Sequence, residues 1–139
     1  MEKLKNMDAD YFNELSLGKF PGHVGVSITE VAPGKIKAEM PVKKELFAPN
    51  GFLHAGSIIT LADTVAGYSC VANLPESAKP FTTIELKSNF MGAARDGVLE
   101  CESIAEHMGR TTHVWRVEVW HKTSKKKVAV FSCTQMILY

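Results

Sequence analysis

The chain has 139 residues, of which 45% are hydrophobic and 22% charged, a composition that fits one folded domain over residues 1 to 139 and excludes a disordered chain. Sixteen Lys and Arg against fifteen Asp and Glu leave a formal net charge of +1, so no overall field favours nucleic acid or a membrane surface. An odd number of cysteines in apolar patterns, and a charged start without a secretory signal, predict reduced thiols in a cytoplasmic protein.

The first third of the chain predicts a helix and a hairpin. Apolar residues from Leu4 to Leu15 follow helical spacing, so we expect a short helix over residues 3 to 17 that Pro21 and Gly22 end. Alternating apolar residues then predict two strands on either side of the turn at residues 33 and 34. Val24, Val26 and Ile28 mark the first strand, and Ile36, Ala38, Met40 and Val42 mark the second.

A long helix and four strands complete the pattern. Residues 57 to 72 combine an apolar face with small residues elsewhere, which predicts a largely enclosed central helix. Alternation predicts four strands after it, separated by turns at residues 92 to 97, 108 to 110 and 122 to 127. The predicted shared faces are Thr82, Ile84, Leu86 and Phe90; Leu99, Cys101 and Ala105; Trp115, Val117 and Val119; and Val128, Val130, Met136 and Leu138.

This element order predicts an α+β fold. A six-stranded antiparallel sheet with one helix against a face follows, because strands joined by short turns tend to pair as neighbours. One helix covers only one face of the sheet, so a second copy of the chain or an edge-to-edge dimer is expected to complete the structure.

Asp63 is the most informative residue. Its neighbours on the predicted helix are apolar or small and offer no cation, and a buried carboxylate without a partner is costly. Either Asp63 lies on a solvated edge of the helix, or it is a catalytic base or nucleophile.

The residues before the helix offer a complementary site. His54, Ala55 and Gly56 directly precede it, and backbone N–H groups in a first helical turn have no intrahelical acceptor. The amides of Ala55 and Gly56 could therefore stabilise an oxyanion formed during acyl transfer. His54 could equally be a loop residue that caps or packs.

Helix geometry separates the two groups. Ala55 and Asp63 are eight residues apart, or about 12 Å along a helix that rises ~1.5 Å per residue. If both act on one carbonyl, the helix start of one subunit must meet Asp63 of another across a two-fold axis.

The stretch NGFLHAGSIITLAD, with FTTIELKSNFM at the start of the last four strands, resembles the hotdog-fold acyl-CoA thioesterases, and among them the phenylacetate-pathway type. The resemblance implies a six-stranded antiparallel sheet wrapped around a long helix, and a homodimer that pairs further into a dimer of dimers. It implies that His54 orients the thioester, that the Ala55 amide binds its carbonyl, and that Asp63 attacks the thioester or activates water. It places Thr83 where relatives carry a residue that positions water or the nucleophile.

The chain departs from the family pattern at two points. Ala55 replaces the first glycine of the family's His-Gly-Gly motif, and Ala48 stands where such relatives have an asparagine. Asn50 either replaces that side chain or only shapes the turn at residues 49 to 51.

The predicted reaction needs no cofactor and no metal, since coenzyme A is part of the substrate. Its phosphates need local cations, for which Arg95 and Arg110 are the candidates, and the turn that holds Arg110 and Thr111 resembles the family's region that contacts the nucleotide end. The lysines at 125 to 127 are expected to form a solvated turn. An acyl-binding module and a hotdog dehydratase remain as alternatives. Large apolar residues could line a pocket for either an aromatic or an aliphatic acyl group: Phe47, Phe52, Leu53, Tyr68 and Phe81.

Overall fold

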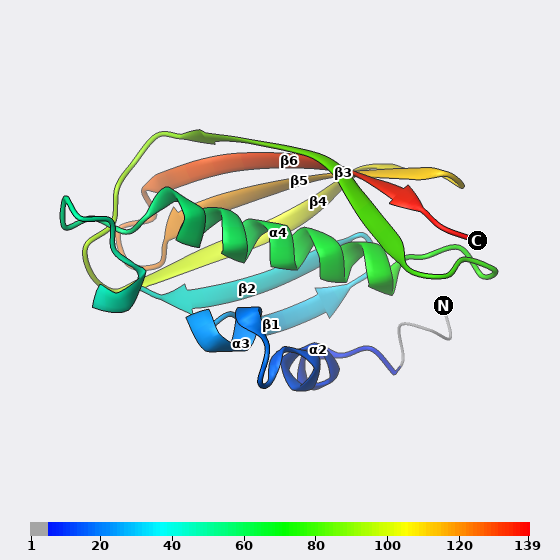
Figure 1. Ribbon diagram of the computed structural model, residues 1–139, viewed down its shortest axis with the longest axis horizontal. Coiled ribbons are helices and arrows are strands. Elements are labelled where there is room, and N and C mark those ends of the chain that lie inside the picture. The colour runs from blue at the N-terminus through cyan, green and yellow to red at the C-terminus, as the bar shows by residue number, and fades with distance from the viewer. Residues whose placement is uncertain (1–5) are drawn as a thin grey trace.

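The computed structural model describes residues 6–139, so the predicted contribution of Leu4 lies outside the described residues. The helices are α2 (Ala9–Ser16), α3 (Phe20–Val24), the 3-10 turn η1 (Lys44–Leu46) and α4 (Ala55–Ala72). The strands are β1 (Ser27–Ala32), β2 (Lys35–Pro41), β3 (Phe81–Phe90), β4 (Val98–Met108), β5 (Thr112–His121) and β6 (Lys127–Ile137). All six form one antiparallel sheet that curves around α4, with α2 and α3 beside β1 (Figure 1). The predicted α+β architecture is confirmed.

The N-terminal helix is shorter than predicted and is followed by a second one. Asp8 caps α2, its side chain accepting a hydrogen bond from the Tyr11 N–H. Pro21 and Gly22 lie inside α3 instead of ending a helix, because proline fits a first helical turn, where its missing N–H has no acceptor to lose. Val24 therefore belongs to α3, and the prediction that it starts the first strand is wrong.

The strand order is β1-β2-β4-β5-β6-β3. Consecutive strands pair as predicted in β1–β2, β4–β5 and β5–β6, but β3 pairs with β6 at the far edge of the sheet. The segment between β3 and β4 crosses the end of the sheet, where the Ala94 carbonyl accepts from the Leu53 N–H. The expected turn between adjacent strands at residues 92 to 97 is therefore wrong.

A bulge in β3 changes which of its residues face the helix. The pairing runs from Thr83 with Gln135 to Glu85 with Thr134, which leaves Ile84 as an extra residue. One extra residue reverses the alternation of faces, so Thr82 and Leu86 lie on opposite faces of the sheet. The predicted shared face of β3 is wrong for this reason.

The predicted face of β6 is wrong in the same way. A register shift in the pairing of β5 with β6 places both Val128 and Ala129 in the core. Beyond it, Phe131, Cys133 and Gln135 are buried, whereas Met136 is exposed.

Helix α4 and the sheet together form the core. Leu61, Val65 and Ala66 are fully buried, as are Trp115 and Phe131 on the sheet. The three cysteines are buried and unpaired, as predicted, and burial raises the pKa of Cys70 and Cys133 to about 12, which keeps these thiols protonated.

By length and composition alone, α4 is also long and apolar enough to cross a membrane. The core helix of a folded domain meets the same criterion. Because α4 packs into the curve of the sheet, it is such a core helix (Figure 1).

Candidate active site

His54 caps the start of α4. Its extended backbone conformation, with ψ of 137°, directs the ring back over the first turn, where Nδ1 accepts the Gly56 N–H at 2.7 Å. A Cβ at position 56 would lie 2.9 Å from that nitrogen, so glycine is what allows the close approach. A neutral imidazole that accepts at Nδ1 carries its proton at Nε2. His54 therefore presents a donor from an exposed position.

The first turn of α4 leaves one amide for a ligand. The Gly56 N–H donates to His54 Nδ1, and the Ser57 N–H donates to the His54 carbonyl at 2.9 Å. Ala55 is the first residue of α4, where an N–H has no intrahelical acceptor. Of the two amides expected to hold an oxyanion, the Gly56 amide is already bonded, so the Ala55 N–H and His54 Nε2 are the donors that the geometry leaves.

Asp63 lies eight residues further along α4 and is half-buried. Its Oδ1 is fully buried and has no hydrogen-bond partner within residues 6–139, and burial raises the pKa of the carboxyl group. A solvated helix edge does not describe this environment.

The structure places Thr83 and Asn50 differently with respect to this helix. Thr83 pairs with the buried Gln135 and so faces the same side of the sheet as α4, at the exposed edge strand. The Asn50 side chain accepts the Phe52 N–H at 3.1 Å within its own loop. Asn50 thus shapes the turn, as the simpler of its two predicted roles requires.

Two grooves meet at His54. The first encloses about 370 Å³ and the second about 390 Å³. Besides His54, the first is lined by Ala48, Asn50, Phe52, Leu53, Ala55, Ile58, Phe90, Gly92 and Ala93. The second is lined by Phe20, His23, Val24, Glu45, Leu46, Phe47, Gly56, Ser57 and Thr60.

The residues of the predicted acyl pocket are divided by this arrangement. Phe47 and Phe52 line different grooves, and Leu53 is buried. The Tyr68 hydroxyl lies 2.7 Å from Ser16 Oγ, and Phe81 packs against α4, where a Cβ at Gly67 would lie 3.2 Å from its ring. Sequence reasoning missed Phe20 and His23, because only tertiary structure brings α3 beside the start of α4.

The candidate phosphate-binding residues lie at two ends of the molecule. The Arg95 guanidinium lies 4.2 Å from the centre of the Phe52 ring, at the end of α4 that carries His54. Arg110 and Thr111 form the turn between β4 and β5, tied to the C-terminal end of the chain. The Tyr139 hydroxyl donates to the Arg110 carbonyl, and the Ile137 N–H donates to the Thr111 carbonyl. One subunit therefore does not bring Arg95 and Arg110 together.

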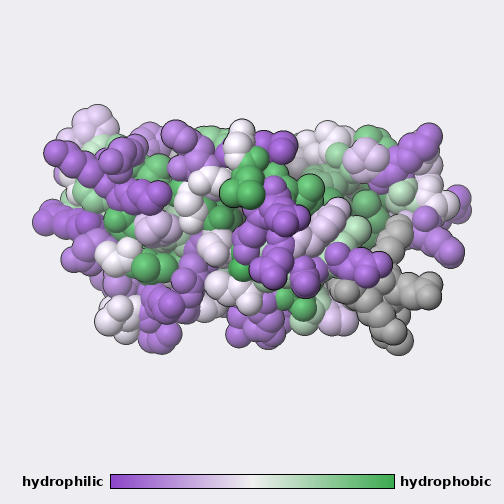
Figure 2. All heavy atoms as spheres, turned by 90° about the horizontal axis from the view of Figure 1, so that it is seen from below, coloured by the Kyte–Doolittle hydropathy of each residue, from purple (hydrophilic) through white to green (hydrophobic). Residues whose placement is uncertain are grey.

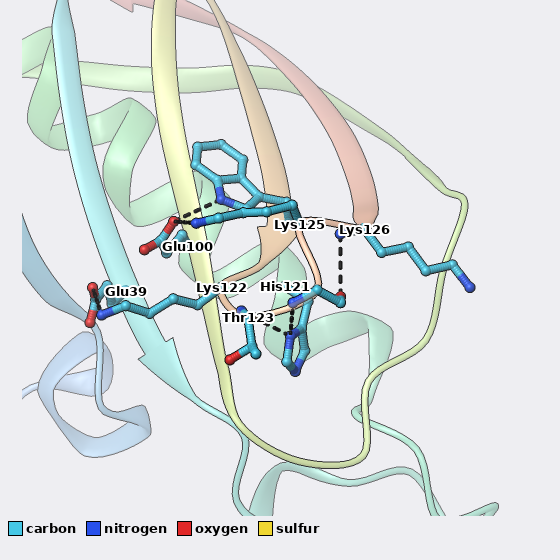
Figure 3. Close-up of polar contacts among 9 residues, drawn as sticks. Glu39, Glu100, His121, Lys122, Thr123, Lys125 and Lys126 are labelled. Atoms are coloured by element: carbon cyan, nitrogen blue, oxygen red, sulfur yellow. Dashed lines mark hydrogen bonds and ion pairs between the residues drawn. The ribbon is translucent and has the colours of Figure 1, made fainter.

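The lysines near residue 125 pair with carboxylates on the sheet. Lys122 Nζ lies 2.6 Å from Glu39 Oε1, and Lys125 Nζ lies 3.7 Å from Glu100 Oε2 (Figure 3). The His121 ring accepts backbone N–H groups of the same turn, and Lys126 extends away from it (Figure 3). These contacts fit the predicted solvated turn.

Buried polar groups also lie on the strands that face α4. His113 and Gln135 pair across β5 and β6, both are almost fully buried, and their side chains have buried atoms without partners in the described chain. No group of three or more His, Cys, Asp or Glu side chains that could hold a metal ion occurs within residues 6–139.

Comparison with known proteins identifies the family. Residues 50–128, more than half of the chain, match the model of the thioesterase superfamily. The chain belongs to this superfamily. The matched segment begins at the loop before His54 and contains every predicted site residue.

Relatives and solved structures extend this result. The chain is 25% identical over 111 residues to the 1,4-dihydroxy-2-naphthoyl-CoA hydrolase of Listeria monocytogenes, covering 80% of this chain and 89% of that protein. It is 26% identical over 114 residues to the proofreading thioesterase EntH of Klebsiella pneumoniae, covering 82% of each. A thioesterase family protein from Silicibacter pomeroyi has a TM-score of 0.80 at 26% identity, over 99% of this chain and 96% of that one.

Mutant thioesterase PA1618 from Pseudomonas aeruginosa shares the fold with a TM-score of 0.89, at 24% identity over 94% of both chains. The predicted hotdog fold and thioesterase family are thus confirmed, and the phenylacetate-pathway type stays a prediction.

Proposed function

We propose that the protein hydrolyses an acyl-CoA thioester in a site that two subunits share. The observation that carries this proposal is Asp63, a half-buried carboxylate whose buried oxygen lacks a partner, on the same helix that presents a capped N-terminus at His54. Two relatives that are 24% and 25% identical are named 1,4-dihydroxy-2-naphthoyl-CoA hydrolases, which supports a CoA thioester as substrate.

The length of α4 between Ala55 and Asp63 explains why two subunits must contribute to one site. Ala55 and Asp63 lie about 12 Å apart along the helix axis, too far to act on one carbonyl within a subunit. If two α4 helices pack antiparallel about a two-fold axis, position 56 faces position 63 of the partner. Residues 59 and 60 then lie at the axis, and each dimer holds two sites.

The exposed edge of the sheet supports such a dimer. Strand β3 is unpaired on one side and carries exposed apolar residues, with Ile84 53% and Leu86 42% exposed. An apolar edge strand left open is an aggregation hazard, and a second copy would cover it. Antiparallel pairing also carries Arg110 and Thr111 of one subunit toward the His54 end of the other.

The chemistry needs only residues of the chain and water. The thioester carbonyl accepts hydrogen bonds from the Ala55 N–H and His54 Nε2 of one subunit, which stabilise the oxyanion. Asp63 of the other subunit takes a proton from water, and the oxygen of that water adds to the carbonyl carbon. The C–S bond then breaks, and the CoA thiolate leaves and takes up the proton. Direct attack by Asp63 through an acyl-enzyme anhydride is the other route to the same products.

Thiol release from a panel of aromatic and aliphatic acyl-CoAs tests the proposal. The wild type should release thiol, and Asp63→Asn should lower kcat by about 10²-fold or more with KM little changed, because only the charged group is lost. Ser88→Ala, a change on β3, is the matched control. Retained acyl-CoA binding without turnover by the wild type would favour a binding module, and hydration of an enoyl-CoA would favour a dehydratase.

Cross-linking tests the shared site separately. Thr60→Cys places a thiol at the inferred two-fold axis, so mild oxidation should give a disulfide-linked dimer on a non-reducing gel. Thr123→Cys, on the exposed turn between β5 and β6, should stay uncross-linked. Failure of Thr60→Cys to cross-link in an active enzyme would contradict the antiparallel packing of α4.

A further inference from the structure

The two grooves that meet at His54 have different chemistry. An acyl-CoA carries its acyl group and its pantetheine arm on opposite sides of the thioester carbonyl. The two halves of such a substrate must therefore leave His54 in different directions. Ala55 lines one groove and Gly56 the other, so the carbonyl site lies where the grooves join.

A nearby positive charge assigns the first groove to the CoA half of the substrate. Its loop carries Phe52 with the Arg95 guanidinium stacked 4.2 Å from the ring centre, which puts a cation beside this groove. The CoA half of the substrate is the anionic half, and arginine is well suited to bind phosphate. The acyl half is then left for the second groove.

The second groove has an apolar wall built by the N-terminal part of the chain. Phe20 from α3 and Phe47, next to η1, present aromatic rings, and Val24 and Leu46 fill the space between elements. The Ser57 and Thr60 hydroxyls donate to the carbonyls of Leu46 and Gly56, so their protons are already used. His23 and Glu45 are the charged or titratable groups at its rim besides His54.

Exposure of Phe20 singles it out. Phe20 is 63% exposed although it lies in a helix beside the core. Together with Leu17 it also lines a separate surface groove at α3. Figure 2, viewed from the side of α2 and α3, shows hydrophobic side chains on this face among hydrophilic ones. Residues 17 to 24 lie outside the segment that matches the superfamily model.

We infer that the groove formed by α3, η1 and the first turns of α4 binds the acyl group, and that Phe20 and Phe47 select an aromatic acyl group by stacking on its ring. Offset or edge-to-face packing of rings adds to simple burial of apolar area. Phe20 is thus a specificity-determining residue. This inference rests on the proposed function, since it names the acyl class for the same site.

The test compares the two halves of the substrate in Phe20→Ala. We expect kcat/KM for benzoyl-CoA to fall about tenfold or more, because a pocket contact of this size is worth that factor. The value for acetyl-CoA, and inhibition by free CoA, should change less than about twofold. Leu17→Ala, an equally exposed neighbour outside the groove, is the matched control. Arg95→Ala should weaken inhibition by free CoA and raise KM for both substrates equally.

Equilibrium binding gives the same comparison without turnover. Calorimetric titration of benzoyl-CoA and of free CoA into the wild type and Phe20→Ala should show a loss of affinity for benzoyl-CoA alone. Equal loss for both ligands, or no loss for either, would overturn the inference. Absence of wild-type turnover with intact selective binding would overturn the proposed hydrolysis but leave the acyl groove supported, so the two failures can be told apart.

Discussion

Strands β3 and β5 have ten residues each but very different surroundings. In β5, buried and half-buried residues alternate along nearly the whole strand, because it has a strand on each side and α4 above it. In β3, exposed residues run from Thr82 to Lys87, because one side of the strand has no partner. Within the sheet, β5 is fully packed inside one chain, and we call this part of the molecule the closed part. The open edge of β3 is the surface that a second copy would cover in the proposed dimer.

The largest expected effect lies in the closed part. Phe131→Ala removes a fully buried ring and should lower the free energy of unfolding by about 3–5 kcal/mol, because a cavity remains. Phe90→Ala, the same change on the exposed edge, should cost about 1 kcal/mol. Urea unfolding of each variant measures the difference, and equal losses would break the comparison.

The open edge should matter for assembly. Leu86→Lys places a charge on the helix-facing side of β3, so the proposed dimer should dissociate and kcat/KM should fall about 10²-fold as the proposed shared site is lost. Met136→Lys, at 43% exposure on the other face of the sheet, is the control and should leave both unchanged. Light scattering after size exclusion gives the mass of each variant. A fully active monomer of Leu86→Lys would contradict the shared site, and an unchanged, active dimer would contradict the role of the β3 edge in assembly.

Two serine hydroxyls, one in the core and one on β3, give the same comparison with a smaller expected effect. Ser103 Oγ accepts the Ile36 N–H at 2.8 Å and lies 2.6 Å from Ser69 Oγ, all in the buried core. Ser103→Ala should cost about 1–3 kcal/mol, because the Ile36 N–H is left buried without an acceptor. Ser88 on β3 makes one long bond of 3.4 Å, and Ser88→Ala should be nearly neutral in the same urea titration.

The smallest effect concerns the charge on Asp63 and depends on pH. Burial raises the pKa of Asp63 in the folded state, so the folded protein holds this proton more tightly than the unfolded chain does. Ionisation therefore lowers stability as pH rises through that range. Asp63→Asn should raise Tm at neutral pH, and the gain should disappear in acid, where the wild-type carboxyl is protonated. A gain in Tm that is the same at all pH values would contradict this origin.

The same raised pKa predicts the acid limb of activity. A general base or nucleophile must be ionised, so kcat/KM should fall on acidification at a pH above that expected for an ordinary aspartate. Rates measured across the acid range, with unfolding followed in parallel, check this expectation.

Local sequence determined most of the helices and strands and the location of the candidate site. The small residues around Asp63 and the HAG step before the helix predicted α4 to within two residues of its start, because helical periodicity and missing first-turn acceptors are local properties. Asn50 likewise shaped its own turn, a contact between residues two positions apart.

Tertiary structure decided the strand faces, the strand order and the contacts between elements, which local sequence patterns do not contain. The bulges at Ile84 and near Val128 reversed the faces of β3 and β6, because one extra residue shifts every later side chain and only the partner strand determines where it fits. The move of β3 to the far edge, the use of the Gly56 amide by His54, and the approach of Phe20 to the start of α4 all depend on contacts between elements. The sequence by itself determined which groups are available for catalysis, and the packing of distant segments decided which of them remain free to act.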